Sequence, residues 1–395
     1  MGQGGGRVGC HGGLIQTDST INSAPQDLSL LIHRMPSINH SQLQAAVEFS
    51  IAHETPWGRD NNEDWGIHHA DPPPWNRLLG PVHPRGPVSG VVRVGGQQVI
   101  AWGEPQRADL TFSIAKTYLA MLAGVAHDRG LLPDMNEPVR MKVPGIGFDS
   151  AHNSAVTWQH LLQQTSEWEG QCFGIPDQVD RYRHLQYQPP RPEIEAAGHK
   201  KADARPLQTP GSYWEYNDVR INQLSLALLH LFRKPLPDVF REAITQPVGA
   251  SDSWRWDGYG NSWVEIDGKS MQSVPGGTHW GAGMSISSED QALIGQMLLN
   301  QGRVAGKQVL SSSWVLRMQT PCAIASWYGA LVWLNRLRGV FPSASANSYF
   351  CIGAGASLVW IDPDRDMVAV VRWIDGSHID GFCQRVAQAV GVKAA

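Results

Sequence analysis

The strand-forming segments of this chain limit the folds that it can adopt. The segment VSGVVRVGGQQVIAWGE alternates around Gly95 and Gly96, which is typical of a β-hairpin. Strand patterns return near the other end of the chain, in residues 327–335, 348–351, 357–361 and 367–374. Because hairpins and consecutive strands favour antiparallel pairing, we predict an α+β fold. In it, an antiparallel sheet is flanked by helices and carries an inserted, mostly helical lobe.

Helical patterns fill the rest of the chain. They cover residues 41–54, with Ser41 as the expected N-cap, and then about 110–130, 156–164, 219–232, 237–245, 287–300 and 379–390. Residues 55–87 are crowded with Pro, Gly, Asp and His, which predicts irregular structure. Residues 171–205 are polar and rich in Pro, which is typical of a mobile loop beside a cleft.

The length of 395 residues allows one large two-lobed body or two domains. Residues 1–38 are rich in Gly, Ser, Asn and Asp and have no sustained period, so we expect a disordered tail. We expect a single domain over residues 39–395. Its α/β lobe would comprise about 39–109 and 271–395, and its helical lobe about 110–270.

Charge and hydropathy exclude several classes of function. The formal charge of −4 provides no basic field for a phosphate backbone, which argues against nucleic acid as a partner. No apolar run approaches the length of a membrane-spanning helix, and the N-terminus lacks the basic-then-apolar layout of a secretory signal. We therefore expect a cytoplasmic protein that binds neither nucleic acid nor membrane.

Cysteine and histidine spacing indicates neither a disulfide framework nor a metal site. The five cysteines are widely scattered, no Cys-x-x-Cys occurs, and free thiols in a reducing compartment are expected. The 15 histidines include the pair His68-His69 but no His-Glu-x-x-His. We predict no metal and no cofactor.

The strongest chemical signal is the segment ADLTFSIAKTYL, in which Ser113 precedes Lys116 by three residues. At this spacing on a helix, the hydroxyl and the amine share one face. A lysine amine so placed can take the proton of a serine nucleophile, provided that its surroundings favour the neutral amine. A capping or surface serine near a solvated lysine gives the same spacing, so the pair alone does not decide the matter.

Three further segments give this pair a context. GSYWEYNDVRIN contains Tyr216 before a helix, GGTHWGAGMSISSEDQALIGQMLLNQG contains His279 and Trp280, and SYFCIGAGASLVWIDPDRDMVAVVRW is rich in Gly and strand-forming residues. With these elements in this order, residues 40–392 resemble the serine hydrolases built on the penicillin-binding-protein and class C β-lactamase fold. That group includes esterases, D-amino-acid peptidases and 6-aminohexanoate-dimer hydrolase.

The resemblance implies a role for each matching residue. Ser113 would be the nucleophile and Lys116 its activating base, and Tyr216 would match the tyrosine that moves protons to and from the leaving group. Cys351, Ile352 and Gly353 take the place of the third family element, usually Lys-Thr-Gly or His-x-Gly. The backbone N–H groups of Ser113 and Ala354 would then form the oxyanion hole. Small residues at Gly353 and Ala354 let the backbone approach a substrate closely.

Two departures from the family pattern bear on function. Asp218 stands where the family usually has Asn, and a carboxylate close to Lys116 would favour the charged amine unless Asp218 faces elsewhere. Cys351 replaces the cation that β-lactamases use for a substrate carboxylate, which favours an uncharged ester or amide over penicillin. As a small residue in a strand, Cys351 is also compatible with simple burial.

These observations lead to one hypothesis with alternatives. We predict a serine hydrolase that forms an acyl-enzyme at Ser113 and cleaves a small-molecule ester or amide. Asp218, Cys351, Gly353, His279 and Trp280 would line the substrate site, although packing explains His279 and Trp280 equally well. The alternatives are a binding or sensor protein on the same fold that has lost turnover, and a β-lactamase or D-peptidase. The sequence leaves the oligomeric state open.

Overall fold

The computed structural model describes residues 1–2, 36–60, 71–190 and 197–393. The helices and strands belong to the compact unit Met35–Ala395. Most of the predicted tail, the His68-His69 pair and residues 191–196 of the polar loop lie outside the described residues.

A six-stranded antiparallel sheet forms the centre of one lobe, with strand order β12-β13-β14-β15-β1-β2. Its strands are β1 (Ser89–Val94), β2 (Gln97–Trp102), β12 (Trp333–Leu334), β13 (Tyr349–Gly353), β14 (Ser357–Asp362) and β15 (Met367–Arg372). The N-terminal hairpin β1–β2 therefore adds to the strands from the C-terminal end through the β1–β15 pairing. This topology brings residues more than 250 positions apart in sequence into one sheet, for example Val91 opposite Val370.

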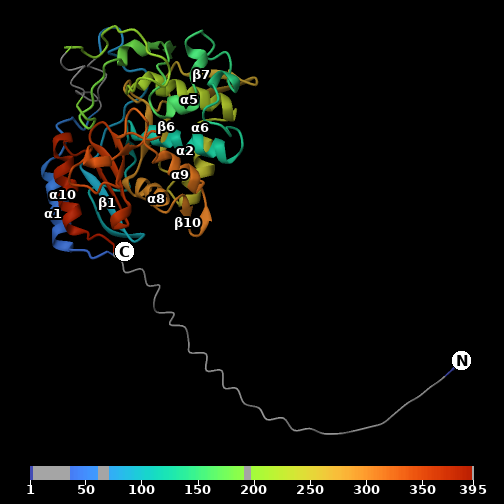
Figure 1. Cartoon of the computed structure of the whole chain (residues 1–395). Helices are drawn as coiled ribbons and strands as arrows, with labels where there is room; N and C mark the ends of the chain where they lie inside the picture. Colours follow the sequence, from blue (N-terminus) through green and yellow to red (C-terminus); the bar gives the residue numbers. More distant parts are fainter. Residues whose placement is uncertain (3–35, 61–70, 191–196, 394–395) are drawn as a thin grey trace. The chain divides into compact units, whose positions relative to one another are not determined.

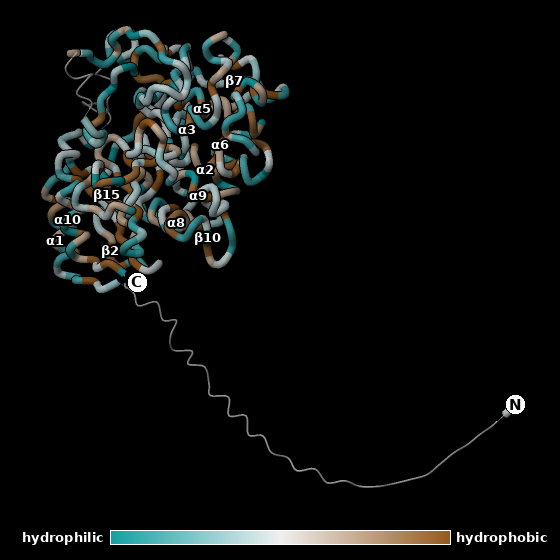
Figure 2. The backbone as a smooth tube through the Cα atoms, viewed as in Figure 1, coloured by the Kyte–Doolittle hydropathy of each residue, from teal (hydrophilic) through white to brown (hydrophobic). Residues whose placement is uncertain are grey.

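Helices cover both faces of this sheet (Figure 1). Helix α1 (His40–Ala52) packs against α10 (Ile379–Ala389) on one side, and α8 (Ser288–Leu299) contacts β1, β14 and β15 on the other. Strands β14 and β15 are buried along their whole length, because both faces of the sheet are covered. Figure 2 shows β15 as a largely hydrophobic segment inside the lobe.

The second lobe is built around α2 (Ile114–Asp128) and α5 (Asp218–Phe232), which pack against each other. Its other helices are α3 (Trp158–Leu162), α6 (Leu236–Phe240), the π-helical turn Arg241–Thr245 and α7 (Gln246–Val248). Helix α9 (Ser312–Met318) packs beside α2, because Nε1 of its Trp314 donates to Ala120 O. Short 3-10 turns occur at Val139–Met141, Asn153–Ala155, Asp177–Asp180, Arg336–Arg338, Pro363–Arg365 and Gly376–His378.

Small sheets join the two lobes and extend the helical one. Strand β9 (Gly283–Ile286) lies between β3 (Asp109–Leu110) and β6 (Arg255–Asp257). The remaining pairs are two-stranded: β4 (Gln171–Cys172) with β5 (Ile175–Pro176), β7 (Trp263–Ile266) with β8 (Lys269–Gln272), and β10 (Arg303–Val304) with β11 (Lys307–Gln308). Because β3 leads directly into α2, its pairing with β9 fixes where α2 begins.

The predicted α+β fold is confirmed, with local differences. The cap of α1 is Asn39, whose side chain accepts from Gln42 N, and not Ser41, which instead donates its hydroxyl to Asn39. The strand expected over residues 327–335 is reduced to Trp333–Leu334, because the preceding residues form turns around Tyr328. The strands β4, β5, β6 and β7 lie within residues 110–270, and β8 begins there, where the sequence indicated mainly helix.

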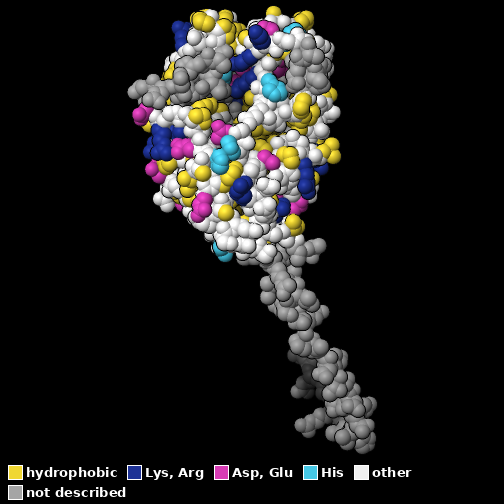
Figure 3. All heavy atoms as spheres, turned by 90° about the vertical axis from the view of Figure 1, so that its left-hand side faces the viewer, with side chains coloured by type: hydrophobic (Ala, Val, Ile, Leu, Met, Phe, Trp, Pro, Cys, Tyr) yellow, Lys and Arg dark blue, Asp and Glu magenta, His cyan; other side chains and the backbone are white. Residues whose placement is uncertain are grey.

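The surface agrees with the modest net charge. On the face drawn in Figure 3, acidic and basic side chains are interspersed with hydrophobic ones and form no large area of one sign. None of the helices in the described ranges has the length and apolar character needed to span a membrane.

Candidate active site

The backbone around Ser113 is held in an unusual conformation. The preceding residue, Phe112, has a left-handed φ of 50°, which typically costs a residue other than glycine about 1–3 kcal/mol. Its ring is buried and packs against Trp57 and Trp373, with ring centroids 5.6 and 6.2 Å away. Such packing can maintain the strained turn, which leads directly into the first turn of α2 at Ile114.

Ser113 and Lys116 are in contact at the start of α2. Lys116 Nζ lies 2.8 Å from Ser113 Oγ. Ser113 occupies the N-cap position, but its side chain makes no capping hydrogen bond, so its hydroxyl is directed to the lysine instead. The capping interpretation of this serine is therefore not supported by the geometry.

The amine of Lys116 is buried among oxygen atoms. Besides Ser113 Oγ, it lies 2.7 Å from Asp218 Oδ1 and 3.4 Å from the carbonyl oxygen of Gly276, and the lysine is 1% exposed. Three acceptors match the three N–H bonds of an ammonium. A neutral amine would keep the contacts to Asp218 and Gly276 and direct its lone pair to the Ser113 hydroxyl. The ammonium and the neutral amine thus differ in the proton that lies between Ser113 Oγ and Lys116 Nζ.

Asp218 is the first residue of α5 and faces Lys116 directly. Its other oxygen, Oδ2, lies 2.9 Å from Nη1 of Arg183, and Asp218 is fully buried. Burial alone would raise the pKa of this carboxyl, but the charges of Arg183 and Lys116 outweigh burial and hold its pKa below the usual value. Asp218 is therefore an anion shared between two cations.

The ring of Tyr216 lies against the amine of Lys116. Lys116 Nζ is 4.6 Å from the centroid of its ring, and the guanidinium carbon of Arg183 is 5.4 Å from the same centroid. The ring stacks on Trp333 at 5.8 Å with an interplanar angle of 27°. Two cations near one aromatic ring are stabilised by its negative face.

The end of β13 approaches the nucleophile closely. A Cβ atom on Gly353 would lie 2.0 Å from the carbonyl oxygen of Thr111 and 3.3 Å from the backbone nitrogen of Ser113. Only glycine permits this approach. Ser113 and Ala354, the residue after Gly353, both line an adjacent cavity. An oxyanion hole formed by their backbone N–H groups stays a sequence prediction.

A cavity of about 360 Å³ opens beside these groups. Its lining includes Ser113, Tyr216, Arg183 and the end of β13 from Ile352 to Ala356. Other walls are formed by Trp57, Tyr187, Trp333 and Asp375. Four aromatic rings (Trp57, Tyr187, Tyr216 and Trp333) therefore share this cavity with Ser113, which suits a small, partly apolar ligand.

The described residues lining this cavity do not include Cys351, His279 or Trp280. Cys351 is buried in β13, and burial raises the pKa of its thiol to about 12, so the thiol is not a reactive thiolate. His279 is 2% exposed, with Nε2 lying 2.8 Å from Asp71, and Trp280 Nε1 donates to the same carboxylate at 2.9 Å. Substrate contact by these three residues stays a sequence prediction.

Comparisons with known proteins agree with this geometry. The model of the family described as Beta-lactamase matches residues 88–373, a range that includes Ser113, Tyr216 and Gly353. The chain belongs to the beta-lactamase family. A search of curated proteins found no match.

Solved structures show the same fold at low sequence identity. A protein of Bacillus anthracis assigned as a 6-aminohexanoate-dimer hydrolase is 18% identical, with a TM-score of 0.53 over 75% of this chain and 77% of its own. The D-stereospecific amidohydrolase from Streptomyces sp. is 18% identical, with a TM-score of 0.53 over 89% and 98% of the two chains. The octameric penicillin-binding protein homologue from Pyrococcus abyssi is 15% identical, with a TM-score of 0.55 over 89% and 77%. The family resemblance seen in the sequence is confirmed.

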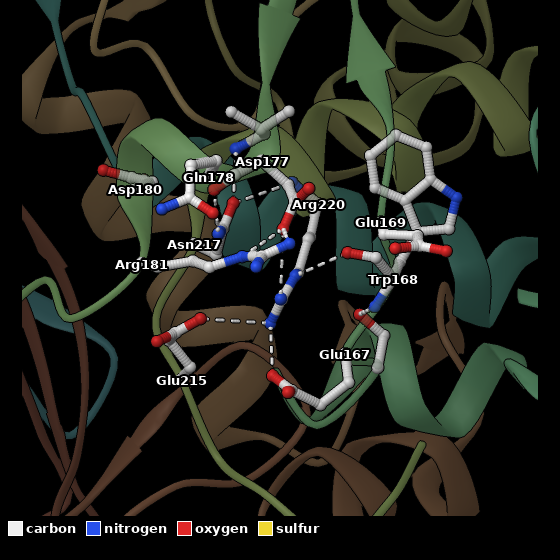
Figure 4. A network of polar contacts seen from close by, with 12 residues as sticks. Glu167, Trp168, Glu169, Asp177, Gln178, Asp180, Arg181, Glu215, Asn217 and Arg220 are labelled. Carbon is white, nitrogen blue, oxygen red and sulfur yellow. Dashed lines mark hydrogen bonds and ion pairs between the residues drawn. The ribbon is translucent and has the colours of Figure 1, made fainter. Parts of the chain in front are cut away.

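A second buried network holds the segment that carries Tyr216 and Asp218 (Figure 4). Asn217, between them, caps α5 by accepting from the backbone of Val219 and Arg220, and its Nδ2 donates to the carbonyl oxygen of Asp177 at 2.9 Å. The buried Arg220 contacts Glu167 at 2.8 Å and Asp177 and Glu215 at 3.3 Å each. Arg205 contacts Glu167 at 2.6 Å and Glu215 at 2.7 Å. Two arginines and three carboxylates thus fix the start of α5.

Sequence reasoning missed several residues of the site. Arg183 lies in the polar stretch 171–205, which was expected to border a cleft, but nothing in its local sequence distinguishes it from Arg181. Trp333 and Trp57 reach the cavity from segments far from the motifs, so only their residue type hinted at a substrate platform. Among the described residues, no cluster of His, Cys, Asp and Glu is arranged to hold a metal ion.

We predict that Gly353→Ala lowers ester hydrolysis by at least about 100-fold, because the methyl group would separate β13 from the nucleophile and misplace the oxyanion donors. Steady-state rates and a thermal melt measure activity and folding. Gly339→Ala is the matched control, since a Cβ there meets its neighbour at an ordinary 3.4 Å. A folded Gly353→Ala protein with wild-type activity would contradict the oxyanion assignment.

Glu167 gives a prediction about acid stability. Burial alone would raise its pKa, but Arg205 and Arg220 hold it below the usual value. The stability that Glu167 contributes is thus present above its unfolded pKa of about 4.3 and is lost as the pH falls below it. Glu167→Gln should lower the unfolding free energy at pH 7 by about 3–5 kcal/mol. It should also flatten the decline in stability between about pH 5 and pH 3.

Urea denaturation at several pH values measures both effects. Glu242→Gln removes an ion pair that is solvent-exposed, and this control should leave the midpoint unchanged. If Glu167→Gln has the same pH dependence as the unsubstituted protein, the network does not contribute to acid stability as proposed.

Proposed function

We propose that this protein is a serine hydrolase that cleaves an ester or amide through an acyl-enzyme on Ser113. The observation that carries the proposal is the 2.8 Å contact between Ser113 Oγ and Lys116 Nζ at the wall of a cavity, with the serine free of any capping role. A buried lysine in direct contact with a serine hydroxyl is an arrangement that can activate a nucleophile.

In the proposed first step, Ser113 Oγ attacks the substrate carbonyl carbon and its proton passes to the neutral amine of Lys116. The carbonyl oxygen becomes an oxyanion, and in this proposal the N–H groups of Ser113 and Ala354 stabilise it. One such donor typically lowers a barrier by roughly 3 kcal/mol. The positive end of α2, which begins at Ile114, adds to this stabilisation.

In the second step the tetrahedral intermediate collapses and the leaving group departs with a proton from Lys116, directly or through the hydroxyl of Tyr216. The acyl group stays on Ser113. Water then attacks the acyl carbon and transfers a proton to the amine. The bond between the acyl carbon and Ser113 Oγ breaks, Ser113 takes the proton back from Lys116, and the carboxylic acid leaves. Tyr216 supports this route because its ring lies against Lys116 and also lines the cavity.

The cavity favours an uncharged scissile group attached to an apolar or aromatic portion, because aromatic rings form much of its wall. The similarity to a D-stereospecific amidohydrolase and to a protein assigned as a 6-aminohexanoate-dimer hydrolase supports amides as well as esters. Penicillin is disfavoured, because the third family element provides Cys351, which is buried away from the cavity, in place of a cation.

A second candidate function is binding without turnover, and the 2.7 Å contact between Lys116 and Asp218 favours it. A carboxylate this close favours the ammonium form, which cannot accept the proton of Ser113. The hydrolase would acylate Ser113 and then release the acyl group, whereas the binding protein would not. Activity measurements distinguish the two.

A panel of p-nitrophenyl esters, D- and L-aminoacyl p-nitroanilides and a chromogenic cephalosporin tests the proposal. We expect turnover of at least one ester or anilide, and a loss of at least about 1,000-fold in Ser113→Ala, because the nucleophile is absent. The control is Ser313→Ala, which changes an exposed serine of α9. Equal rates for the unsubstituted protein and Ser113→Ala would support the binding candidate instead.

A further inference from the structure

Arg183 contacts two buried carboxylates, and one of them also contacts the candidate base. Its Nη1 lies 2.9 Å from Asp218 Oδ2 and 3.0 Å from Asp180 Oδ2, and its side chain is 9% exposed. It also lines the cavity together with Ser113 and Tyr216. Arg183 therefore belongs to the active site by position, although it lies outside the three sequence elements that carry the family resemblance.

The two oxygens of Asp218 divide its interactions. Oδ1 lies 2.7 Å from Lys116 Nζ, and Oδ2 lies 2.9 Å from Arg183. If Lys116 were the sole partner of this buried anion, the anion would hold the amine in the ammonium form. A second cation on the same carboxylate compensates its charge and also repels the charge of the ammonium. Arg183 thus reduces the tendency of Asp218 to hold Lys116 in the ammonium form.

Further ion pairs extend from Arg183 in the direction away from Ser113. Asp180, at the end of the 3-10 turn Asp177–Asp180, lies 3.3 Å from Lys201. Lys201 in turn contacts Asp71, which lies 2.8 Å from His279. Burial and the nearby cations lower the pKa of His279, which is therefore neutral at pH 7. Three cations, Lys116, Arg183 and Lys201, consequently face three carboxylates, Asp218, Asp180 and Asp71.

Phenols also lie near Lys116 and Asp218. Tyr216 faces both Lys116 and Arg183 with its ring. Burial raises the pKa of Tyr259 and of Tyr328 well above the usual value, so both stay neutral. Among the described residues, removal of the Arg183 charge would leave Lys116 as the only basic side chain in contact with Asp218.

We propose that Arg183 is a positioning residue for proton transfer. Its guanidinium balances the negative charge of Asp218, so that Lys116 can accept the proton of Ser113. The proposal rests on the proposed hydrolase function. In the step concerned, the O–H bond of Ser113 breaks, its proton goes to the lone pair of Lys116, and the oxygen forms a bond to the substrate carbonyl carbon. The proton later leaves with the alcohol or amine product.

The test is the pH profile of kcat/KM for an ester substrate. Arg183→Gln should move the midpoint of the acidic limb to higher pH by about one unit or more, since Asp218 then acts on Lys116 alone. Arg183→Lys, which keeps the charge, should restore the midpoint to within a few tenths of a unit. Asp218→Asn should move it in the opposite direction, to lower pH, because the ammonium loses its anionic partner.

The matched control is Arg181→Gln, which removes a buried ion pair two residues away, 2.9 Å from Asp177, without contact to Asp218. This change should lower stability but leave the midpoint in place. Ser113-dependent hydrolysis with an unshifted midpoint in Arg183→Gln would overturn the inference alone. No Ser113-dependent hydrolysis in the unsubstituted protein would overturn the proposed function and the inference together. If Arg183→Gln does not fold, an unshifted or raised midpoint in Asp218→Asn overturns the inference.

Discussion

The ion pair between Lys116 and Asp218 is the interaction on which the rest of the candidate site depends. Both groups are almost completely buried, and desolvating two charges costs several kcal/mol unless further polar contacts compensate. In this site the compensation comes from Ser113, Gly276 and Arg183. The ion pair joins α2 to α5, and the second oxygen of Asp218 contacts Arg183, which lies in the loop that forms a wall of the cavity.

The site is assembled from elements that the fold brings together from distant parts of the chain. The turn before α2 supplies the candidate nucleophile, the end of β13 supplies a close backbone approach, and the segment that leads into α5 supplies Tyr216 and Asp218. Glycine at position 353 and the network around Arg220 fix two of these elements relative to the third. Each element is held in place by packing or by charge pairing. The arrangement suits acyl transfer only when all three elements are present.

Local sequence patterns predicted the parts of the structure that local physics determines. The hairpin at Gly95 and Gly96 and helices α5 and α8 follow from turn chemistry and hydrophobic periodicity, and the Ser113–Lys116 contact follows from helical spacing. The roles of Asp218 and Arg183 depend on which segments fold against them. The sequence raised the possibility that Asp218 faces Lys116, but it could not indicate that Arg183, 35 positions earlier, shares the carboxylate. For the same reason, the stacking of Trp333 on Tyr216 could not be foreseen.

The central claim is that Lys116 activates Ser113 as a nucleophile, and covalent labelling tests it most directly. The protein would be treated with a fluorophosphonate at neutral pH, digested, and its peptides analysed by mass spectrometry. We expect one adduct, on the peptide that contains Ser113, and its loss in a folded Lys116→Ala protein. Labelling of Ser113 at an undiminished rate in Lys116→Ala, or no labelling of Ser113 in the unsubstituted protein, would contradict the claim.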